Sequence, residues 1–345
     1  MTPTPIGRRR AAAHFAALIA ISAASLLTSP PARSLDTSRP DVQSFMTDLV
    51  TADGFDRAYI TAVFSGIESR QSILDAMSRP AEKVKPWSEY RKIFLTPGRI
   101  SAGVDFFREH EARLRKITTK TGIPAEIIVA ILGVETFYGT RTGSYRAVDA
   151  LATLGFDYPE RGAFFSKELR QLFLLAREEQ LDIGKLIGSY AGALGPPQFI
   201  PSSYRNFAVD GSGDGRRDLL RNWDDIMASI ANYFVQHNWQ PGQPIATRAE
   251  FARDATRPAG PADLVLKDTV GSLARQGVQF TTDLPDTAPA LLVTLQGEDG
   301  DEHWVGFQNY FAITRYNRST MYALAVFQLS EAIAAGVRTE GASSE

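Results

Sequence analysis

The sequence predicts a mainly α-helical protein of the α+β class, in which a helical body carries a small β-containing subdomain. Two observations predict the body: apolar residues recur at helical spacing between about 41 and 121, and a nearly continuous apolar run extends from Ile127 to Val134. A third observation predicts the subdomain, because prolines punctuate short apolar runs between about 240 and 314. Helix, strand and helix are therefore expected in that order along the chain.

Composition indicates an ordinary globular protein. The 345 residues are 44% hydrophobic and 22% charged, which suits one large domain or about two to three modest ones. A net charge of -2 gives no electrostatic reason to expect nucleic acid as a partner. The absence of cysteine excludes disulfides, thiolate nucleophiles and cysteine-ligated metals, and the four histidines form no HExxH pair.

Residues 1–34 are predicted to be a cleavable secretory signal. Arginines at 8–10 precede an alanine-rich apolar run over 11–27, and a small-x-small site follows at 32–34. An uncleaved membrane anchor is the alternative, since the run approaches the length that spans a bilayer. The alanine content and the prolines after it favour cleavage. The mature protein is thus expected in the periplasm, without stable membrane insertion.

Helices are expected throughout 35–121, the first predicted region of the mature chain. Val42, Met46 and Leu49 recur at helical spacing. Thr96 and the proline after it are suited to the N-cap and first turn of a helix that runs to about Lys120. Further helices are expected over 164–180 and 226–236.

The most informative stretch is Pro124 to Gly139. It starts with a proline suited to a first helical turn and ends at a glycine suited to a C-terminal cap, and its apolar content predicts burial on all sides. Glu135 would lie above Ile131 and Leu132, where loss of hydration raises the pKa of a carboxyl group. Such a group can act as a general acid near neutral pH. The alternative is a carboxylate that pairs with an arginine at the end of the helix.

A second stretch, 189–203, is rich in small residues and prolines. The small residues let backbone or ligand approach closely, and the prolines at 196–197 exclude regular helix or a paired central strand. The loop would display Ser189 and Gln198, whose side chains are able to hydrogen-bond a polar ligand. The alternative is a purely structural turn.

A third stretch, Asp210 to Gly215, matches the opening of a calcium-binding EF-hand loop. Oxygen-bearing side chains occupy its positions 1, 3 and 5 and glycine its position 6, while position 7 would contribute a backbone carbonyl. Position 12 is Arg221, where the motif requires a bidentate glutamate, so that a carboxylate would have to come from Asp224 or Asp225. The alternative is a solvated turn. The candidate ligands are Asp210, Ser212, Asp214, Arg216 and Asp225.

The segment 240–314 is predicted to be the β-containing subdomain. Its clearest feature is a hairpin, formed by the apolar runs 291–295 and 304–307 with a glycine- and acid-rich turn over 297–302. The last segment, 315–345, is expected to form a C-terminal helix that packs back on the body.

Together these stretches resemble the membrane-bound lytic murein transglycosylase B family, from about residue 40 to 335. The resemblance implies a lysozyme-like catalytic core over 122–239, with a helical domain and a small β-containing subdomain beside it. The motifs that carry it lie at 133–139, 150–154, 188–195, 198–204, 210–215, 231–234 and 313–322.

The resemblance also implies roles for individual residues. Glu135 falls on the catalytic acid/base, Ser189 and Gln198 on the glycan groove, and the Asp210 loop on a structural calcium site whose late carboxylate is Asp225. The chain departs from the family pattern at prolines 196–197 and at Glu160. Further groove positions fall on Tyr90, Arg161, Tyr233, Asn317 and Tyr322.

The implied reaction cleaves the β1,4 bond between N-acetylmuramic acid and N-acetylglucosamine and leaves 1,6-anhydromuramoyl ends. It needs no catalytic cofactor, and its partners are peptidoglycan glycan strands, with cell-wall machinery proteins of unknown identity. Two alternatives stay open: a hydrolytic muramidase on the same core and a non-catalytic peptidoglycan-binding protein. A hydrolase usually has a second carboxylate about 5 Å or more from the acid. Asp149 or Asp157 would have to fold close to Glu135 to supply it.

Overall fold

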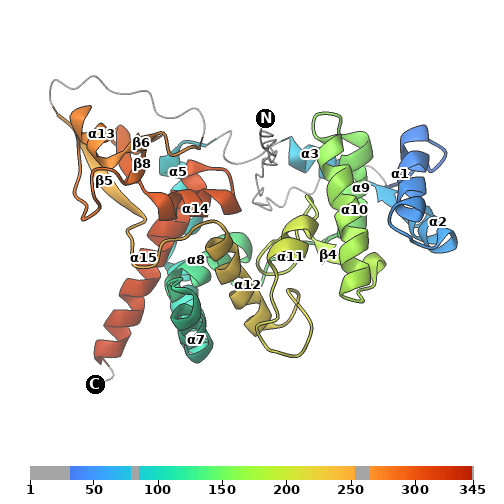
Figure 1. Cartoon of the computed structure of the whole chain (residues 1–345), viewed down its shortest axis with the longest axis horizontal. Helices are drawn as coiled ribbons and strands as arrows, with labels where there is room; N and C mark the ends of the chain where they lie inside the picture. Colours follow the sequence, from blue (N-terminus) through green and yellow to red (C-terminus); the bar gives the residue numbers. More distant parts are fainter. Residues whose placement is uncertain (1–31, 79–84, 253–263, 344–345) are drawn as a thin grey trace, which may run out of the picture.

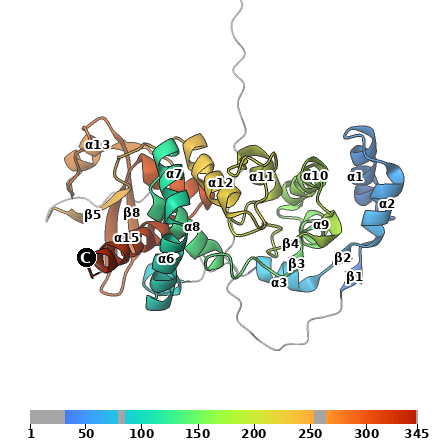
Figure 2. The same ribbon diagram turned by 90° about the horizontal axis from the view of Figure 1, so that it is seen from below.

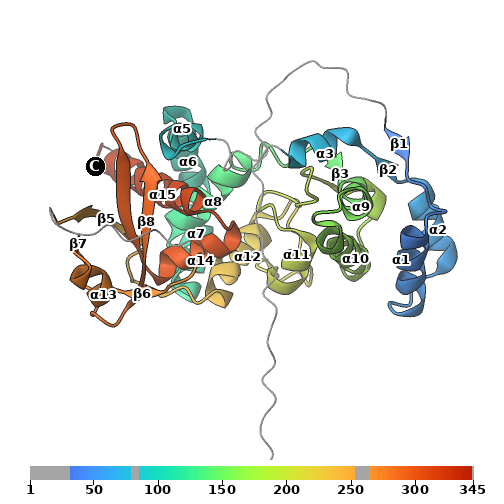
Figure 3. The same ribbon diagram turned by 90° about the horizontal axis from the view of Figure 1, so that it is seen from above.

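Two groups of helices lie side by side and make up most of the fold (Figure 1). The computed structural model describes residues 32–78, 85–252 and 264–343, so most of the predicted signal segment lies outside the described residues. Figures 2 and 3 place one group at one end of the molecule and a small sheet at the other. The mainly α-helical α+β class predicted from the sequence is confirmed.

One group forms around α9 and α10, which pack closely against each other. Phe64 from this group stacks on Phe173 with ring centroids 5.8 Å apart, which joins the N-terminal helices to α10. A two-residue strand pair, β1 (Arg33–Ser34) with β2 (Glu68–Ser69), closes its outer edge. The helices are α1 (Pro40–Thr51), α2 (Arg57–Ser65), α3 (Gln71–Met77), α9 (Ala147–Asp157) and α10 (Gly162–Glu178).

The second group forms around α8 and α15, which pack along each other. Its helices come from three separate parts of the sequence. Helices from before and after residue 121, where the sequence predicted a boundary, therefore pack together in this group. Its members are α5 (Trp87–Phe94), α6 (Pro97–Glu109), α7 (Glu111–Thr121), α8 (Ala125–Thr136), α12 (Trp223–Gln236), α14 (Gln308–Tyr316) and α15 (Thr320–Ser343).

The prediction of a single helix from Thr96 to Lys120 is wrong in one respect, because the chain turns at His110 and forms two helices, α6 and α7. The cap at its start is confirmed, since the Thr96 side chain accepts a hydrogen bond from Arg99 N. The break has a tertiary cause. The His110 ring is buried against Phe106 and Trp223, at centroid distances of 4.3 and 5.4 Å, and this aromatic contact turns the chain.

The helix α8 is buried on nearly all sides, as expected, but it ends earlier than its sequence suggests. Its C-cap is Phe137, with φ 50°, and Tyr138 is also left-handed, so the chain leaves the helix before Gly139. Left-handed backbone is unfavourable for a residue with a Cβ. Here Tyr138 N donates to Leu132 O at 3.0 Å and its phenol donates to Arg99 O at 2.8 Å, which offsets that cost.

The helix α15 confirms the prediction that the C-terminal segment packs back on the body. Leu324, Leu329 and Ile333 are fully buried along it. By length and composition alone, residues 320–339 of this helix are apolar enough to cross a membrane, and α7 with α8 passes the same test only as a pair bent by 116°. Core helices of globular proteins meet this criterion too, and α15 packs along α8.

The predicted hairpin is confirmed as the centre of a five-stranded antiparallel sheet. The strands β8 and β9 pair from Leu291 with Gly306 to Gln296 with Asp301, and the strand order is β6-β8-β9-β5-β7. Figure 3 shows the sheet outside α15, with α13 (Val270–Arg275) beside it. The strands are β5 (Ala246–Phe251), β6 (Asp268–Thr269), β7 (Val278–Gln279), β8 (Pro289–Gln296) and β9 (Asp301–Gly306).

Candidate active site

The last turn of α8 places Glu135 beside the first turn of α15. The carboxylate oxygen Oε1 accepts a hydrogen bond from the Tyr322 hydroxyl at 2.6 Å, between residues 187 positions apart in the chain. Tyr322 is fully buried, and Glu135 is half-buried. Burial raises the pKa of Tyr322 well above its ordinary value, and the negative charge of Glu135 raises it further. The phenol therefore stays protonated and serves as a fixed donor to the carboxylate.

The loop that contains prolines 196 and 197 is hydrogen-bonded to side chains of α8 and α14. The Thr136 hydroxyl donates to Pro196 O at 2.9 Å, and the Tyr316 hydroxyl donates to Pro197 O at 2.6 Å. The pKa of Tyr316 is raised well above its usual range by burial and then by the charge of Glu135. The two carbonyls that the prolines present are thus fixed by one side chain from α8 and one from α14.

Both polar side chains predicted on this loop support its shape. The buried Ser189 hydroxyl oxygen accepts hydrogen bonds from Ala191 N at 3.3 Å and Ala193 N at 3.1 Å. Gln198 has a left-handed φ of 51°, and its Nε2 donates to Gly195 O at 2.9 Å. Within the described ranges, no hydrogen bond uses the Ser189 hydroxyl hydrogen or Gln198 Oε1.

Three of the other predicted groove residues come from the helices around Glu135 and are largely buried. Tyr90 contributes to the raised pKa of Tyr322, the Tyr233 hydroxyl donates to Arg315 O at 2.5 Å, and Asn317 is 1% exposed. Arg161 instead begins α10 in the other helix group, half-buried with its guanidinium 4.7 Å from the Phe164 ring centroid. Burial lowers the pKa of Arg161.

Two carboxylates considered as partners of Glu135 are engaged elsewhere. Asp149 is fully buried and pairs with Arg146 at 2.7 Å. Asp157 pairs with Arg39 at 2.5 Å. Both lie on α9, whose main packing partners are α10, α3 and β2. These two aspartates therefore do not serve as a second catalytic carboxylate.

Sequence reasoning missed Arg99, a buried cation under the end of α8. Its Nη1 donates to Gly133 O, which also accepts from Phe137 N, and its guanidinium lies 5.0 Å from the Phe137 ring centroid. Burial lowers the pKa of Arg99. A cation is favourable at a helix C-terminus, where free carbonyls accumulate. No local sequence pattern marks this residue, because its partners lie more than thirty positions away.

The predicted metal loop brings its acidic groups together. Ligand oxygens of Asp210, Asp214 and Asp225 lie within 4.8 Å of one another, and Ser212 Oγ donates to Asp210 Oδ1 at 3.2 Å. Hydrogen bonds from loop N–H groups, the one from Gly215 above all, lower the pKa of Asp210.

Of the two candidates for the late carboxylate, Asp225 lies with the acidic groups of the loop. Asp225 is fully buried and accepts hydrogen bonds from three backbone N–H groups at or near the loop, at 2.8 to 3.0 Å. Asp224 instead pairs with Arg113 at 3.2 Å. An all-oxygen set of carboxylates and loop carbonyls fits a calcium ion, with Arg216 offering its carbonyl.

Comparison with known proteins agrees with this architecture. Residues 37–331 match the family described as the transglycosylase SLT domain. Membrane-bound lytic murein transglycosylase B of Escherichia coli (strain K12) is 41% identical over 308 residues, which cover 86% of this chain and 83% of that protein.

Solved structures are similar over nearly the same range. Soluble lytic transglycosylase SltB1 from Pseudomonas aeruginosa is 47% identical with a TM-score of 0.82, over 88% of this chain and 100% of that one. The Escherichia coli lytic transglycosylase Slt35 in complex with calcium is 39% identical with a TM-score of 0.79, over 89% and 96%. The chain belongs to the transglycosylase SLT domain family.

Proposed function

We propose that this protein is a lytic transglycosylase that cleaves the β1,4 bond between N-acetylmuramic acid and N-acetylglucosamine in peptidoglycan. Glu135 is its acid/base, and the products carry 1,6-anhydromuramoyl ends. The observation that carries the proposal is the hydrogen bond from buried Tyr322 to Glu135, in a family of transglycosylases. A carboxyl group held in one orientation by a protonated phenol is suited to proton transfer.

One carboxyl group suffices for this reaction because the substrate supplies its own nucleophiles. Glu135 as acid gives a proton to the glycosidic oxygen, and the N-acetyl oxygen of the muramoyl residue stabilises the positive charge that develops at C1. Glu135 as base then takes the proton of the C6 hydroxyl, whose oxygen attacks C1 and closes the anhydro ring. The proton returns to Glu135, and no water is consumed.

Positioning the sugar is the task of the surrounding groove. In this proposal the Ser189 hydroxyl hydrogen and Gln198 Oε1 face ligand groups, and the hydrogen bonds to the proline carbonyls at 196–197 fix the loop that carries them. Alignment of the C6 hydroxyl with C1 supplies much of the advantage of an intramolecular attack. The remaining groove residues in this proposal are Tyr90, Arg161, Tyr233, Asn317 and Tyr322.

The two alternatives make different products. A hydrolytic muramidase would release reducing ends, and the engagement of Asp149 and Asp157 by arginines disfavours it. A non-catalytic binding protein would release nothing.

Digestion of purified sacculi followed by mass spectrometry tests the proposal. The wild type is expected to release anhydromuropeptides, and Glu135→Gln should lower the rate at least about a hundredfold, since general acid–base catalysis typically contributes that much. Retained binding of Glu135→Gln to sacculi serves as the control for folding. Reducing ends without anhydro ends would establish the hydrolase, and no release by the wild type would overturn both enzymatic assignments.

We also propose that the Asp210 loop binds a structural calcium ion through Asp210, Ser212, Asp214, Asp225 and the carbonyl of Arg216. The ion would neutralise the clustered carboxylates and stabilise the loop that precedes α12. The calcium-bound structure of Slt35 supports this assignment by similarity. The ion has no part in the proposed reaction.

A thermal melt with and without calcium tests the site. Calcium at about a hundred times its dissociation constant should stabilise the wild type by about 2.7 kcal/mol. Asp214→Ala should abolish this increment, whereas Asp299→Ala, which removes one exposed carboxylate from the β8–β9 turn, should retain it. Equal increments in both variants would show that calcium acts elsewhere.

Export to the periplasm by a cleaved signal is the third part of the proposal. Cleavage after Ser34 would remove strand β1, whose two residues pair with β2. Intact mass of the protein isolated from the periplasm should show the loss of residues 1–34. A retained N-terminus would establish the membrane anchor instead.

A further inference from the structure

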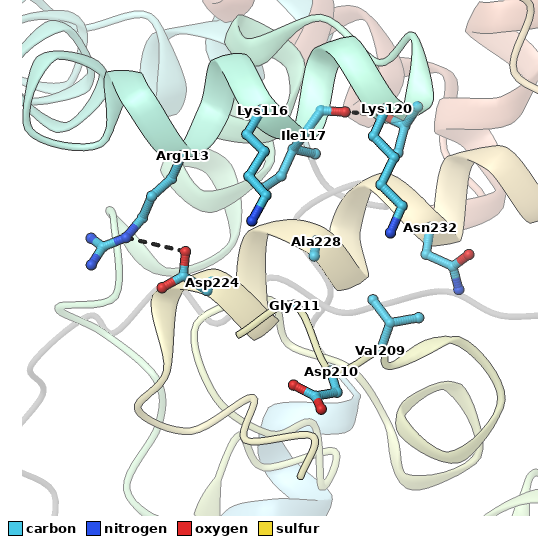
Figure 4. Close-up of a pocket in the computed structure, with 11 residues that line it drawn as sticks. Arg113, Lys116, Ile117, Lys120, Val209, Asp210, Gly211, Asp224, Ala228 and Asn232 are labelled. Carbon is cyan, nitrogen blue, oxygen red and sulfur yellow. Dashed lines mark hydrogen bonds and ion pairs between the residues drawn. The ribbon is translucent and has the colours of Figure 1, made fainter. Parts of the chain in front are cut away.

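A small pocket between α7 and α12 lies apart from the groups that surround Glu135 (Figure 4). Its volume is about 210 Å³, and its walls come from α7, α12 and residues 209–211 at the start of the metal loop. The proposed reaction uses none of its side chains. Its charge pattern suggests a second binding site.

One face of α7 carries all the cationic groups of the pocket. Arg113, Lys116 and Lys120 follow one another at intervals of three and four residues, so they project from the same side of the helix. Figure 4 shows Lys116 and Lys120 extending side by side toward α12.

The two acidic groups in the lining are already engaged. Asp224 pairs with Arg113 at 3.2 Å. Asp210 accepts hydrogen bonds from Gly213 N at 2.6 Å and Gly215 N at 2.7 Å, which orient its carboxylate toward the metal loop but leave its charge in place. Neither carboxylate is paired with a lysine of the pocket.

With Arg113 and Asp224 paired, two lysines face one remaining carboxylate, Asp210, so the lining keeps an excess of one positive charge. Across the ranges the structure describes, the exposed side chains of Lys116 and Lys120 make no ion pair and no hydrogen bond. Like charges four residues apart on a helix repel each other. An anion between the two ammonium groups would relieve this repulsion and form charge-assisted hydrogen bonds.

The rest of the lining limits the size and character of that anion. Ile117, Val209 and Ala228 form an apolar floor, and Asn232 adds a polar group at the α12 side. Pockets for drug-sized ligands are larger, about 300–1,000 Å³, so this one suits a small group and excludes a sugar chain. A carboxylate next to a methyl-sized side chain fits this lining, because the carboxylate can pair with the lysines and the small side chain can contact the apolar residues.

We propose that this pocket binds the terminal carboxylate of a short peptide whose last side chain is small. The proposal does not depend on glycan cleavage by Glu135. Such a terminus occurs on polypeptides, which consist of L-residues, and on the short wall peptides of peptidoglycan, which contain D-residues. The stereochemistry of the ligand therefore distinguishes the two sources.

NMR titration of the full mature chain in calcium-containing buffer tests the proposal, with alanyl-alanine in its L,L and D,D forms as probes. At least one form should bind, and its C-terminal amide should bind at least about tenfold more weakly, because hydrogen bonds to charged groups contribute about 1.5–3 kcal/mol. Tighter binding of the D,D form would identify a wall peptide as the source, and tighter binding of the L,L form a polypeptide terminus.

Two double variants complete the experiment. Lys116→Gln with Lys120→Gln should weaken binding by about tenfold or more and leave the melting temperature unchanged. Lys167→Gln with Lys267→Gln removes the same charge from exposed positions elsewhere and should bind like the wild type. Equal loss in both variants, equal binding of acid and amide, or tighter binding of inorganic phosphate than of either peptide would overturn the proposal.

Discussion

At the scale of single residues, the defining contact is the hydrogen bond between Tyr322 and Glu135. Sequence alone places a carboxyl group at the end of a buried helix, and the structure adds the donor that orients it. Because burial keeps the phenol protonated, this donor is present throughout the neutral pH range. A fixed orientation matters more for a lone acid/base than for a pair, since the same oxygen must give one proton and take another.

Tyr322→Phe tests this role. The substitution keeps the ring and removes the hydroxyl, so the rate of anhydromuropeptide release should fall about ten- to a hundredfold, which corresponds to 1.5–3 kcal/mol for a hydrogen bond to a charged group. KM should change little.

Tyr204→Phe, on α11 (Pro201–Phe207), is the matched control, because it removes another buried hydroxyl, one that donates to Arg217 O and accepts from Leu219 N. Its activity should stay close to that of the wild type. A similar loss of rate in both variants would show that buried hydroxyls act through stability and not through Glu135.

At the scale of elements, the loop between β4 (Ile187–Gly188) and α11 is built by close backbone contacts. Gly195 has φ 66°, and a Cβ there would lie 2.0 Å from Leu219 O. Its carbonyl accepts hydrogen bonds from both the backbone and the side-chain nitrogen of Gln198. The glycine therefore allows the contact that places Gln198 beside the groove.

Gly195→Ala should destabilise the protein by about 2 to 5 kcal/mol, the sum of left-handed strain and overpacking. Urea unfolding measures this cost, and the KM for sacculi should rise because Gln198 shifts.

Gly242→Ala provides the comparison at an open site, with φ 72° and no neighbour within 4 Å of the added Cβ. It should cost only about 1–2 kcal/mol, the strain alone. Equal destabilisation by the two variants would mean that the close contact between the added Cβ at position 195 and Leu219 O is relieved at no cost in stability.

At the scale of the whole molecule, one buried and one half-buried imidazole link stability to pH. His237 stacks on Tyr233 at a centroid distance of 4.1 Å, and His110 lies among the rings between α6 and α7. Burial lowers the pKa of both histidines below the ordinary value of 6.5. The folded state therefore binds fewer protons than the unfolded state just below that pH.

Proton linkage gives the direction in which stability changes with pH. The contribution of both histidines is fully present above pH 6.5 and is lost as the pH falls through the lowered pKa values. The free energy of unfolding should thus decrease from pH 7.5 to pH 5, as measured by urea denaturation. His237→Gln, which does not titrate, should reduce the decrease. An identical pH dependence in the variant would exclude His237 as a contributor.

Local sequence signals predicted much of this architecture. The apolar run before Glu135 specified a helix buried on all sides, and alternating apolar runs around an acidic turn specified the β8–β9 hairpin. These signals succeed because helix and hairpin depend on neighbours within a few residues. They fail at His110 and Phe137, where aromatic contacts and hydrogen bonds from distant helices override the local preference of the chain.

By itself, the sequence determined the family, the main helices, the hairpin and the presence of a candidate acid at Glu135. Only the tertiary structure decided which groups surround that acid. It brought Tyr322 to the carboxylate and turned Asp157 toward Arg39. The physical reason is that these pairings join residues held close by the packing of separate helices, whose mutual orientation no local pattern encodes.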